Sequence, residues 1–88
     1  MNVKRPNPDA VLPEGAGFPL RLWYQMERQG LTVMRLAEKS GIAHPNIWGY
    51  MNGRMEPRME KLIRLAKALG VSLDWLCGLT DEQEKGGQ

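Results

Sequence analysis

Apolar residues in the middle of the chain recur three or four positions apart and do not alternate with polar ones. This spacing predicts amphipathic helices and gives no indication of strands. Four apolar stretches are each followed by glycine or by an asparagine–glycine pair, at 20–29, 33–40, 45–51 and 59–69. A fifth, short helix begins after Ser72. The pattern predicts an all-α fold, a compact five-helix domain.

One face of each helix should form the core. In the first helix the apolar positions at helical spacing are Leu22, Trp23 and Met26. In the fourth helix they are Met59, Leu62, Ile63, Ala66 and Leu69. The fifth helix offers Leu73, Leu76 and Leu79. Thr32 and Ser72 stand immediately before the second and fifth helices, where a hydroxyl can accept a hydrogen bond from a free helical amide. We expect both residues to be N-caps.

The flanking segments differ in composition from the body. Residues 1–19 hold four of the six prolines and few aliphatic residues, which predicts a flexible arm before a domain at 20–80. Residues 81–88 are polar and should form a tail. No apolar run approaches the roughly 18 residues of a membrane helix, and we find no secretory signal. The lone Cys77 fits a reducing compartment, so we expect a cytoplasmic protein without membrane contact.

Three small or aliphatic residues at fixed spacing predict a helix-turn-helix between residues 33 and 52. Ala37 lies where two helices would cross closely, and Gly41 lies in the turn, where a left-handed backbone is cheap only without a Cβ. Ile47 would hold the second helix on the first. The apolar seam is completed by Leu36, Ile42 and Tyr50. Such a unit can place its second helix in the DNA major groove.

Residues 31–79 resemble the lambda-repressor-like, Xre/Cro-type helix-turn-helix family of phage and bacterial regulators. The matching residues are Leu31-Thr32, Leu36-Ala37-Glu38-Lys39, Gly41-Ile42, Ile47, Asn52-Gly53, Pro57, Leu62, Leu65-Ala66-Lys67-Ala68-Leu69-Gly70-Val71-Ser72 and Asp74-Trp75-Leu76. The resemblance implies a five-helix domain that binds double-stranded DNA operators. It implies a small, often homodimeric regulator that represses or activates transcription, and we expect a repressor with the helix at 45–51 in the major groove.

The charge distribution is compatible with a polyanionic partner. Residues 20–70 contain nine basic and four acidic residues, whereas the chain after Gly70 has four acids and one lysine. A basic body with an acidic tail suits DNA. From charge alone, however, a solvated surface of mixed sign is the favoured explanation.

Outward positions of the third helix should contact bases. His44 and Asn46 can hydrogen-bond base edges, whereas Pro45 and Trp48 can offer only apolar contact, for example to thymine methyl groups, together with the indole N–H. Gly49 would permit close approach of the backbone. For His44 the alternative is an ordinary surface imidazole, and for Trp48 it is contact with a protein partner or with a second copy of the chain.

Phosphate contacts are expected around this helix. The backbone amides of Thr32 and Val33 open the second helix and could bind a phosphate. Further candidates are Arg35, Arg54, Arg58 and Asn52, the last matching a family position that touches the DNA backbone. A self-interface could use Trp75, Leu79 and Cys77, although Trp75 has the core as its alternative.

Three features depart from the family pattern and leave a second function open. Val33 stands where glutamine is common, Ala43 replaces a capping residue, and the outward face of the third helix is largely apolar. The alternative is a protein-interaction module on the same fold, such as an antitoxin or a phage protein that binds a host factor through the face around Trp48.

An enzyme is not expected. The sequence has one histidine and one cysteine, in different elements, so neither a metal cluster nor a nucleophile–base pair follows from the spacing. No glycine-rich phosphate loop is present. We therefore expect no metal and no cofactor.

Overall fold

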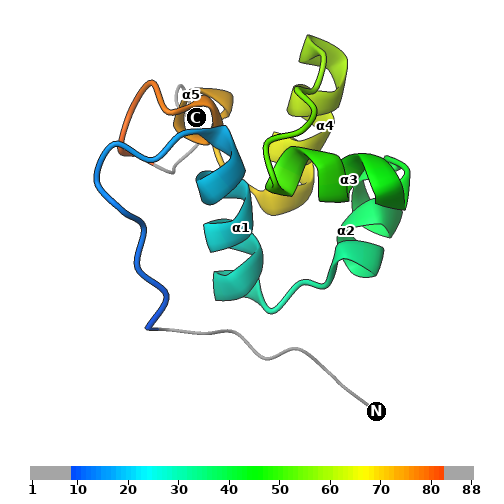
Figure 1. Cartoon of the computed structure of the whole chain (residues 1–88), viewed down its shortest axis with the longest axis horizontal. Helices are drawn as coiled ribbons and strands as arrows, with labels where there is room; N and C mark the ends of the chain where they lie inside the picture. The colour runs from blue at the N-terminus through cyan, green and yellow to red at the C-terminus, as the bar shows by residue number, and fades with distance from the viewer. Residues whose placement is uncertain (1–8, 83–88) are drawn as a thin grey trace.

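The computed structural model describes residues 9–82, and within this range α-helices are the only regular secondary structure. The helices are α1 (Phe18–Gln29), α2 (Val33–Ser40), α3 (His44–Met51), α4 (Met59–Leu69) and α5 (Leu73–Cys77). Helix α2 packs against α3 and α4, while α1 packs against α3 and α5 (Figure 1). The prediction of an all-α fold with five helices is confirmed. No helix in the described range is both long and apolar enough to cross a bilayer.

Local signals at the helix ends account for the helix boundaries. The hydroxyls of Thr32 and Ser72 accept hydrogen bonds from the amides of Arg35 and Trp75, so both predicted caps are confirmed. Gly41 ends α2 with a φ of 72°, a conformation that favours glycine. The predicted bounds of α2 and α4 agree with the structure. Helix α3 begins one residue earlier than predicted, at His44.

The core lies where all five helices meet. The largest fully buried side chains are those of Leu22, Leu36, Ile47, Leu65, Trp75 and Leu76. Trp75 is therefore a core residue, which settles its role in favour of packing. Trp23, expected inside, is only half-buried.

The prediction for the inner face of α4 is partly wrong. Met59 and Ile63 are 63% and 38% exposed, whereas Leu65, which the apolar spacing did not single out, is fully buried. Apolar residues cover a stripe of α4 wider than the surface that α2 and α5 can cover. Spacing alone cannot tell which edge of such a stripe faces the core.

The folded part of the chain begins earlier than the predicted boundary at residue 20. Helix α1 starts at Phe18, Ala16 is buried, and Leu12 packs against the core. A glycine at 17 and a proline in the first turn allow the helix to start there. The arm predicted at 1–19 is therefore wrong for its last residues, while residues 1–8 and 83–88 lie outside the described range.

Arg21 is buried on α1 and joins both ends of the described chain to the core. Its guanidinium donates hydrogen bonds to the carbonyls of Ala16, Trp75 and Thr80, at 2.8, 3.1 and 3.2 Å. It also lies 5.2 Å from the Trp75 ring centroid and 3.5 Å from the exposed Asp81 carboxylate. Arg21 is one of the nine basic residues counted over 20–70, but the residue is only 4% exposed and its charge serves the fold.

Candidate nucleic-acid interface

The turn between α2 and α3 is held by hydrogen bonds within the motif. The Ser40 hydroxyl donates to the Leu36 carbonyl at 2.7 Å and accepts from the Ile42 amide at 3.2 Å. From α4, Arg64 donates to the Gly41 carbonyl at 3.4 Å. Ala37 is half-buried and packs against the core, in keeping with a close approach of α2 to α3. These contacts fix the direction in which α3 leaves the turn.

Helix α3 has a clear inner and outer side. Ile47 and Tyr50 are buried. Successive residues turn by about 100°, so the positions furthest from this buried side are Pro45, Trp48, residue 49 and Asn52. Pro45 and Asn52 are exposed. His44 and Asn46 flank this outer line, with His44 exposed and Asn46 half-buried.

Gly49 lies on the outer line of α3, yet it is buried because the next loop folds back over it. The amides of Arg54 and Met55 both donate to the Gly49 carbonyl, at 2.9 and 3.2 Å. A Cβ atom at position 49 would lie 2.5 Å from Met55 Sδ and 2.8 Å from Met55 Cγ, closer than real contacts. The expectation that Gly49 leaves the helix backbone open to a ligand is therefore corrected. Met55 occupies that space.

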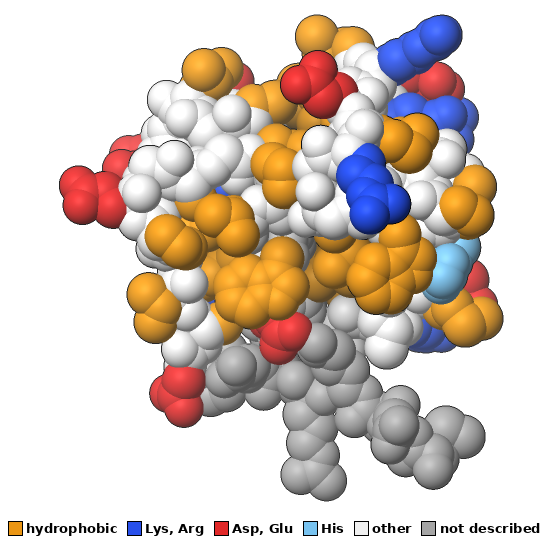
Figure 2. Space-filling model, viewed as in Figure 1, with side chains coloured by type: hydrophobic (Ala, Val, Ile, Leu, Met, Phe, Trp, Pro, Cys, Tyr) orange, Lys and Arg blue, Asp and Glu red, His pale blue; other side chains and the backbone are white. Residues whose placement is uncertain are grey.

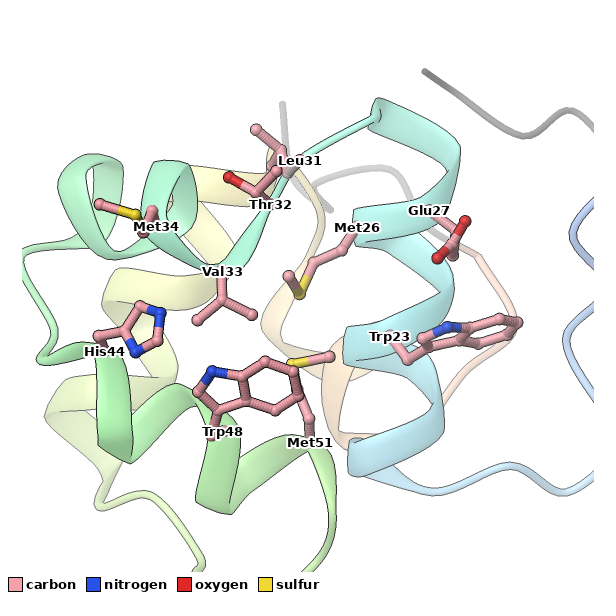
Figure 3. A pocket seen from close by; sticks show the side chains of 10 residues that line it. All are labelled: Trp23, Met26, Glu27, Leu31, Thr32, Val33, Met34, His44, Trp48 and Met51. Atoms are coloured by element: carbon pink, nitrogen blue, oxygen red, sulfur yellow. The ribbon is translucent and has the colours of Figure 1, made fainter. Parts of the chain in front are cut away.

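Trp48 borders an open apolar hollow of about 690 Å³ between α1, α2 and α3, which we term the α1–α3 hollow. Its ring is half-exposed and contacts His44 edge-on, with ring centroids 6.3 Å apart. Figure 3 shows Val33, Met26 and Met51 turned toward the same space from three helices. Apolar side chains also spread across the face of the molecule seen in Figure 2. Trp48 thus lies on the edge of the outer line that faces α1.

The predicted phosphate ligands lie in two groups. Arg54 and Arg58 are exposed in the loop after α3, and Arg54's amide donates to the Asn52 side chain at 3.1 Å. Thr32 and Val33 open α2, where the Thr32 hydroxyl already accepts from the Arg35 amide. The Val33 side chain is buried, so only its backbone could serve a phosphate.

Arg35 is exposed on α2 and forms an ion pair with Glu38 at 3.3 Å. An exposed pair of this kind is weak and easily exchanged. A phosphate could therefore displace Glu38 at little cost, but Arg35 is less available than the two loop arginines.

The residues proposed for a self-interface do not form one surface. Trp75 is buried in the core, whereas Leu79 is 78% exposed. Cys77 is half-buried, and burial together with the nearby Asp74 carboxylate raises the pKa of its thiol. The thiol therefore stays protonated at neutral pH.

Two structural features of the molecule were missed at the level of sequence, the position of Met55 and the burial of Arg21. Met55 lacks any pattern of its own, but a glycine inside a short helix can signal close approach of another segment. Nothing in the sequence indicates that Arg21 is buried, because it is one of many basic residues in the segment 20–70. No cluster of three or more metal-ligating side chains occurs within residues 9–82.

Comparison with known proteins places these features in a family. The helix-turn-helix family matches residues 24–76. An HTH-type transcriptional regulator of Bacillus subtilis, YobD, is 43% identical over 54 residues, which are 61% of this chain and 48% of that protein. The cryptic phage CTXphi transcriptional repressor RstR of Vibrio cholerae is 36% identical over 67 residues, 74% of this chain and 60% of the repressor.

A crystal structure of a transcriptional regulator from Listeria innocua shares the fold, with a TM-score of 0.65 and 32% identity. The match covers 81% of this chain and 64% of that one. The chain thus spans between about half and two thirds of the length of these proteins. The match over residues 24–76 includes the α2–α3 motif and the two helices that follow it, and the chain belongs to the helix-turn-helix family.

Proposed function

We propose that this protein binds double-stranded DNA as a transcriptional regulator, with α3 in the major groove. The observation that carries the proposal is the outward side of the α2–α3 motif. Ile47 and Tyr50 pack α3 against the core. Within residues 9–82 the opposite side of α3 is exposed, except where Met55 covers Gly49. A protruding helix on such a motif fits the width of the major groove. The names of the two curated relatives support the same function.

The side chains divide into base and phosphate contacts. His44 and Asn46 would hydrogen-bond base edges, while Pro45 and Trp48 would make apolar contacts. Phosphates would be bound by the set already placed around α3, namely Arg54, Arg58, Asn52, Arg35 and the backbone amides of Thr32 and Val33. Gly49 contributes no contact in this proposal, because Met55 covers it.

A domain of this size would bury roughly 600–1,000 Å² of its surface on DNA, which is the range of a single recognition module. Strong site selection therefore requires two copies on half-sites about 34–36 Å apart. We propose a homodimer that acts as a repressor in the cytoplasm. The exposed Leu79, just beyond α5, is the candidate for the dimer contact.

Sequence preference should depend on Asn46 and not on Asn52. An asparagine amide can pair with both the N6 and N7 atoms of adenine, a contact worth about 1–3 kcal/mol of discrimination. Sites selected from a random duplex library by the wild type should therefore bind Asn46→Ala with less preference over random DNA. Asn52→Ala should weaken all duplexes alike, because a backbone contact carries no sequence information.

Competitive gel shifts with selected and random duplexes measure both quantities. The roles are wrong if Asn46→Ala keeps the full preference of the wild type. They are also wrong if Asn52→Ala loses that preference while its affinity for random DNA is unchanged.

A protein-interaction module is the second candidate, favoured by the α1–α3 hollow beside Trp48. A partner such as a toxin or a host factor would bury this apolar surface, whereas DNA has few apolar groups to fill it. The module would bind no duplex even at low salt. In a pull-down, Trp48→Ala would then lose a partner that the wild type retains.

A further inference from the structure

We propose that Met55 is a specificity-determining residue that selects base pairs carrying a C5-methyl group in the major groove. The inference rests on the proposed DNA binding and extends it to the chemistry of the preferred site. That chemistry has two sources in DNA, the methyl group of thymine and the methyl group of 5-methylcytosine.

The position of Met55 on the outside of α3 is the first argument. Its Sδ, Cγ and Cβ atoms lie 2.5, 2.8 and 3.3 Å from the place where residue 49 would carry a Cβ. The thioether thus stands where a side chain from the outer line of α3 would stand. It is still 43% exposed, so it covers Gly49 and also presents an apolar surface outward.

The composition of the outer line is the second argument. Helix α3 reads HPNIWGYM and has no arginine, lysine, glutamine or carboxylate. Its outer positions supply Pro45, Trp48, the Met55 thioether over Gly49, and Asn52 just beyond the helix. Apart from the indole N–H of Trp48, only Asn52 has a polar side chain here, and its oxygen already accepts a hydrogen bond from the Arg54 amide. The centre of the surface therefore lacks the groups that hydrogen-bond base edges.

The third argument is complementarity. The C5-methyl group is the largest apolar group that bases expose in the major groove. An apolar surface placed against any other base edge would remove water from that edge without replacing its hydrogen bonds, which is unfavourable. Arg54 is adjacent to Met55 and exposed, so a phosphate bound there would hold the thioether close to the groove.

The experiment uses the full chain and random duplex libraries prepared in three forms. One contains thymine, one has deoxyuridine in place of thymine, and one has deoxyuridine together with 5-methylcytosine. Removing one buried methyl group costs about 0.8 kcal/mol, which corresponds to about a fourfold loss of affinity. We expect sites selected from the thymine library to lose about fourfold for each contacted thymine changed to uracil. Selection of high-affinity sites from the third library but not from the deoxyuridine library would identify 5-methylcytosine as a second source of the methyl group.

Two variants connect this discrimination to Met55. Met55→Ala should bring the thymine-to-uracil affinity ratio close to one at the base pair that Met55 contacts, and Gly49→Ala should do the same by displacing the thioether. The matched control is Met34→Ala, which removes a 65% exposed methionine from α2 and should keep the ratio of the wild type. Circular dichroism melting confirms that the variants are folded.

The outcomes separate the inference from the function on which it rests. If the wild type selects DNA sites but binds their thymine and uracil forms equally, methyl recognition is overturned and DNA binding stands. If the ratio survives in Met55→Ala, Met55 is not the residue responsible. If no library yields a site, the proposed function fails and the inference fails with it.

Discussion

Replacing Arg21 with methionine is expected to lower the free energy of unfolding by about 3 kcal/mol. The variant keeps the apolar stem but removes the donors to the three carbonyls of Ala16, Trp75 and Thr80. Buried carbonyls without a donor are costly, and the cation over the Trp75 ring is lost as well. For a domain of this size the melting temperature should fall by roughly 12–24 °C. Urea unfolding followed by circular dichroism measures the change.

Arg28→Met is the matched control for this prediction. Arg28 is on the same helix but exposed, with its guanidinium 5.7 Å from the Tyr24 ring centroid. An exposed contact of this kind contributes at most about 1 kcal/mol. If the two methionine variants lose the same stability, the structural role given to Arg21 is wrong.

Reversing the charge of both Arg54 and Arg58 is expected to weaken duplex binding by more than about 100-fold at 0.1 M salt. Each phosphate contact contributes a salt dependence of about 0.9 log units per decade, so at this salt each lost contact costs nearly tenfold. The repulsion of two new glutamates adds to that loss. Gel shifts with one labelled duplex of about 25 base pairs measure the effect.

The matched control is Lys39→Glu combined with Lys67→Glu. These exposed lysines border a shallow surface hollow between α2 and α4. Each replacement changes the charge by two, so both double variants change the formal net charge from +2 to −2. A similar loss of affinity in the control would mean that net charge, and not the loop after α3, governs binding.

The fold was predictable because its local signals agree with one another. Glycine positions, hydroxyl caps and helical spacing independently place the same boundaries around α2, and the small residue at 37 fits the crossing with α3. The prediction failed on α4, where the apolar spacing offers more residues than the core can bury. Met59 and Ile63 extend the apolar stripe of α4 without belonging to its buried side. Only the arrangement of the neighbouring helices decides which edge of that stripe is buried.

The surface chemistry was less predictable because it depends on contacts between distant segments. Helical spacing correctly puts residue 49 on the outside of α3, but it cannot reveal that the loop returns Met55 to this position. Likewise, Arg21 has the sequence context of a surface residue. Its burial depends on carbonyl groups from residues 75 and 80, more than fifty positions away. The roles assigned to His44, Asn46, Arg54 and Arg58 stay predictions.

The central claim is that the exposed side of α3 and its flanking arginines bind duplex DNA. Its most direct test is fluorescence anisotropy of the wild-type chain with a random duplex across salt concentrations from about 50 to 200 mM. We predict measurable binding, and a plot of log affinity against log salt with a slope of roughly −3, as expected for about three neutralised phosphates. Absence of binding at the lowest salt, or a slope near zero, would contradict the account.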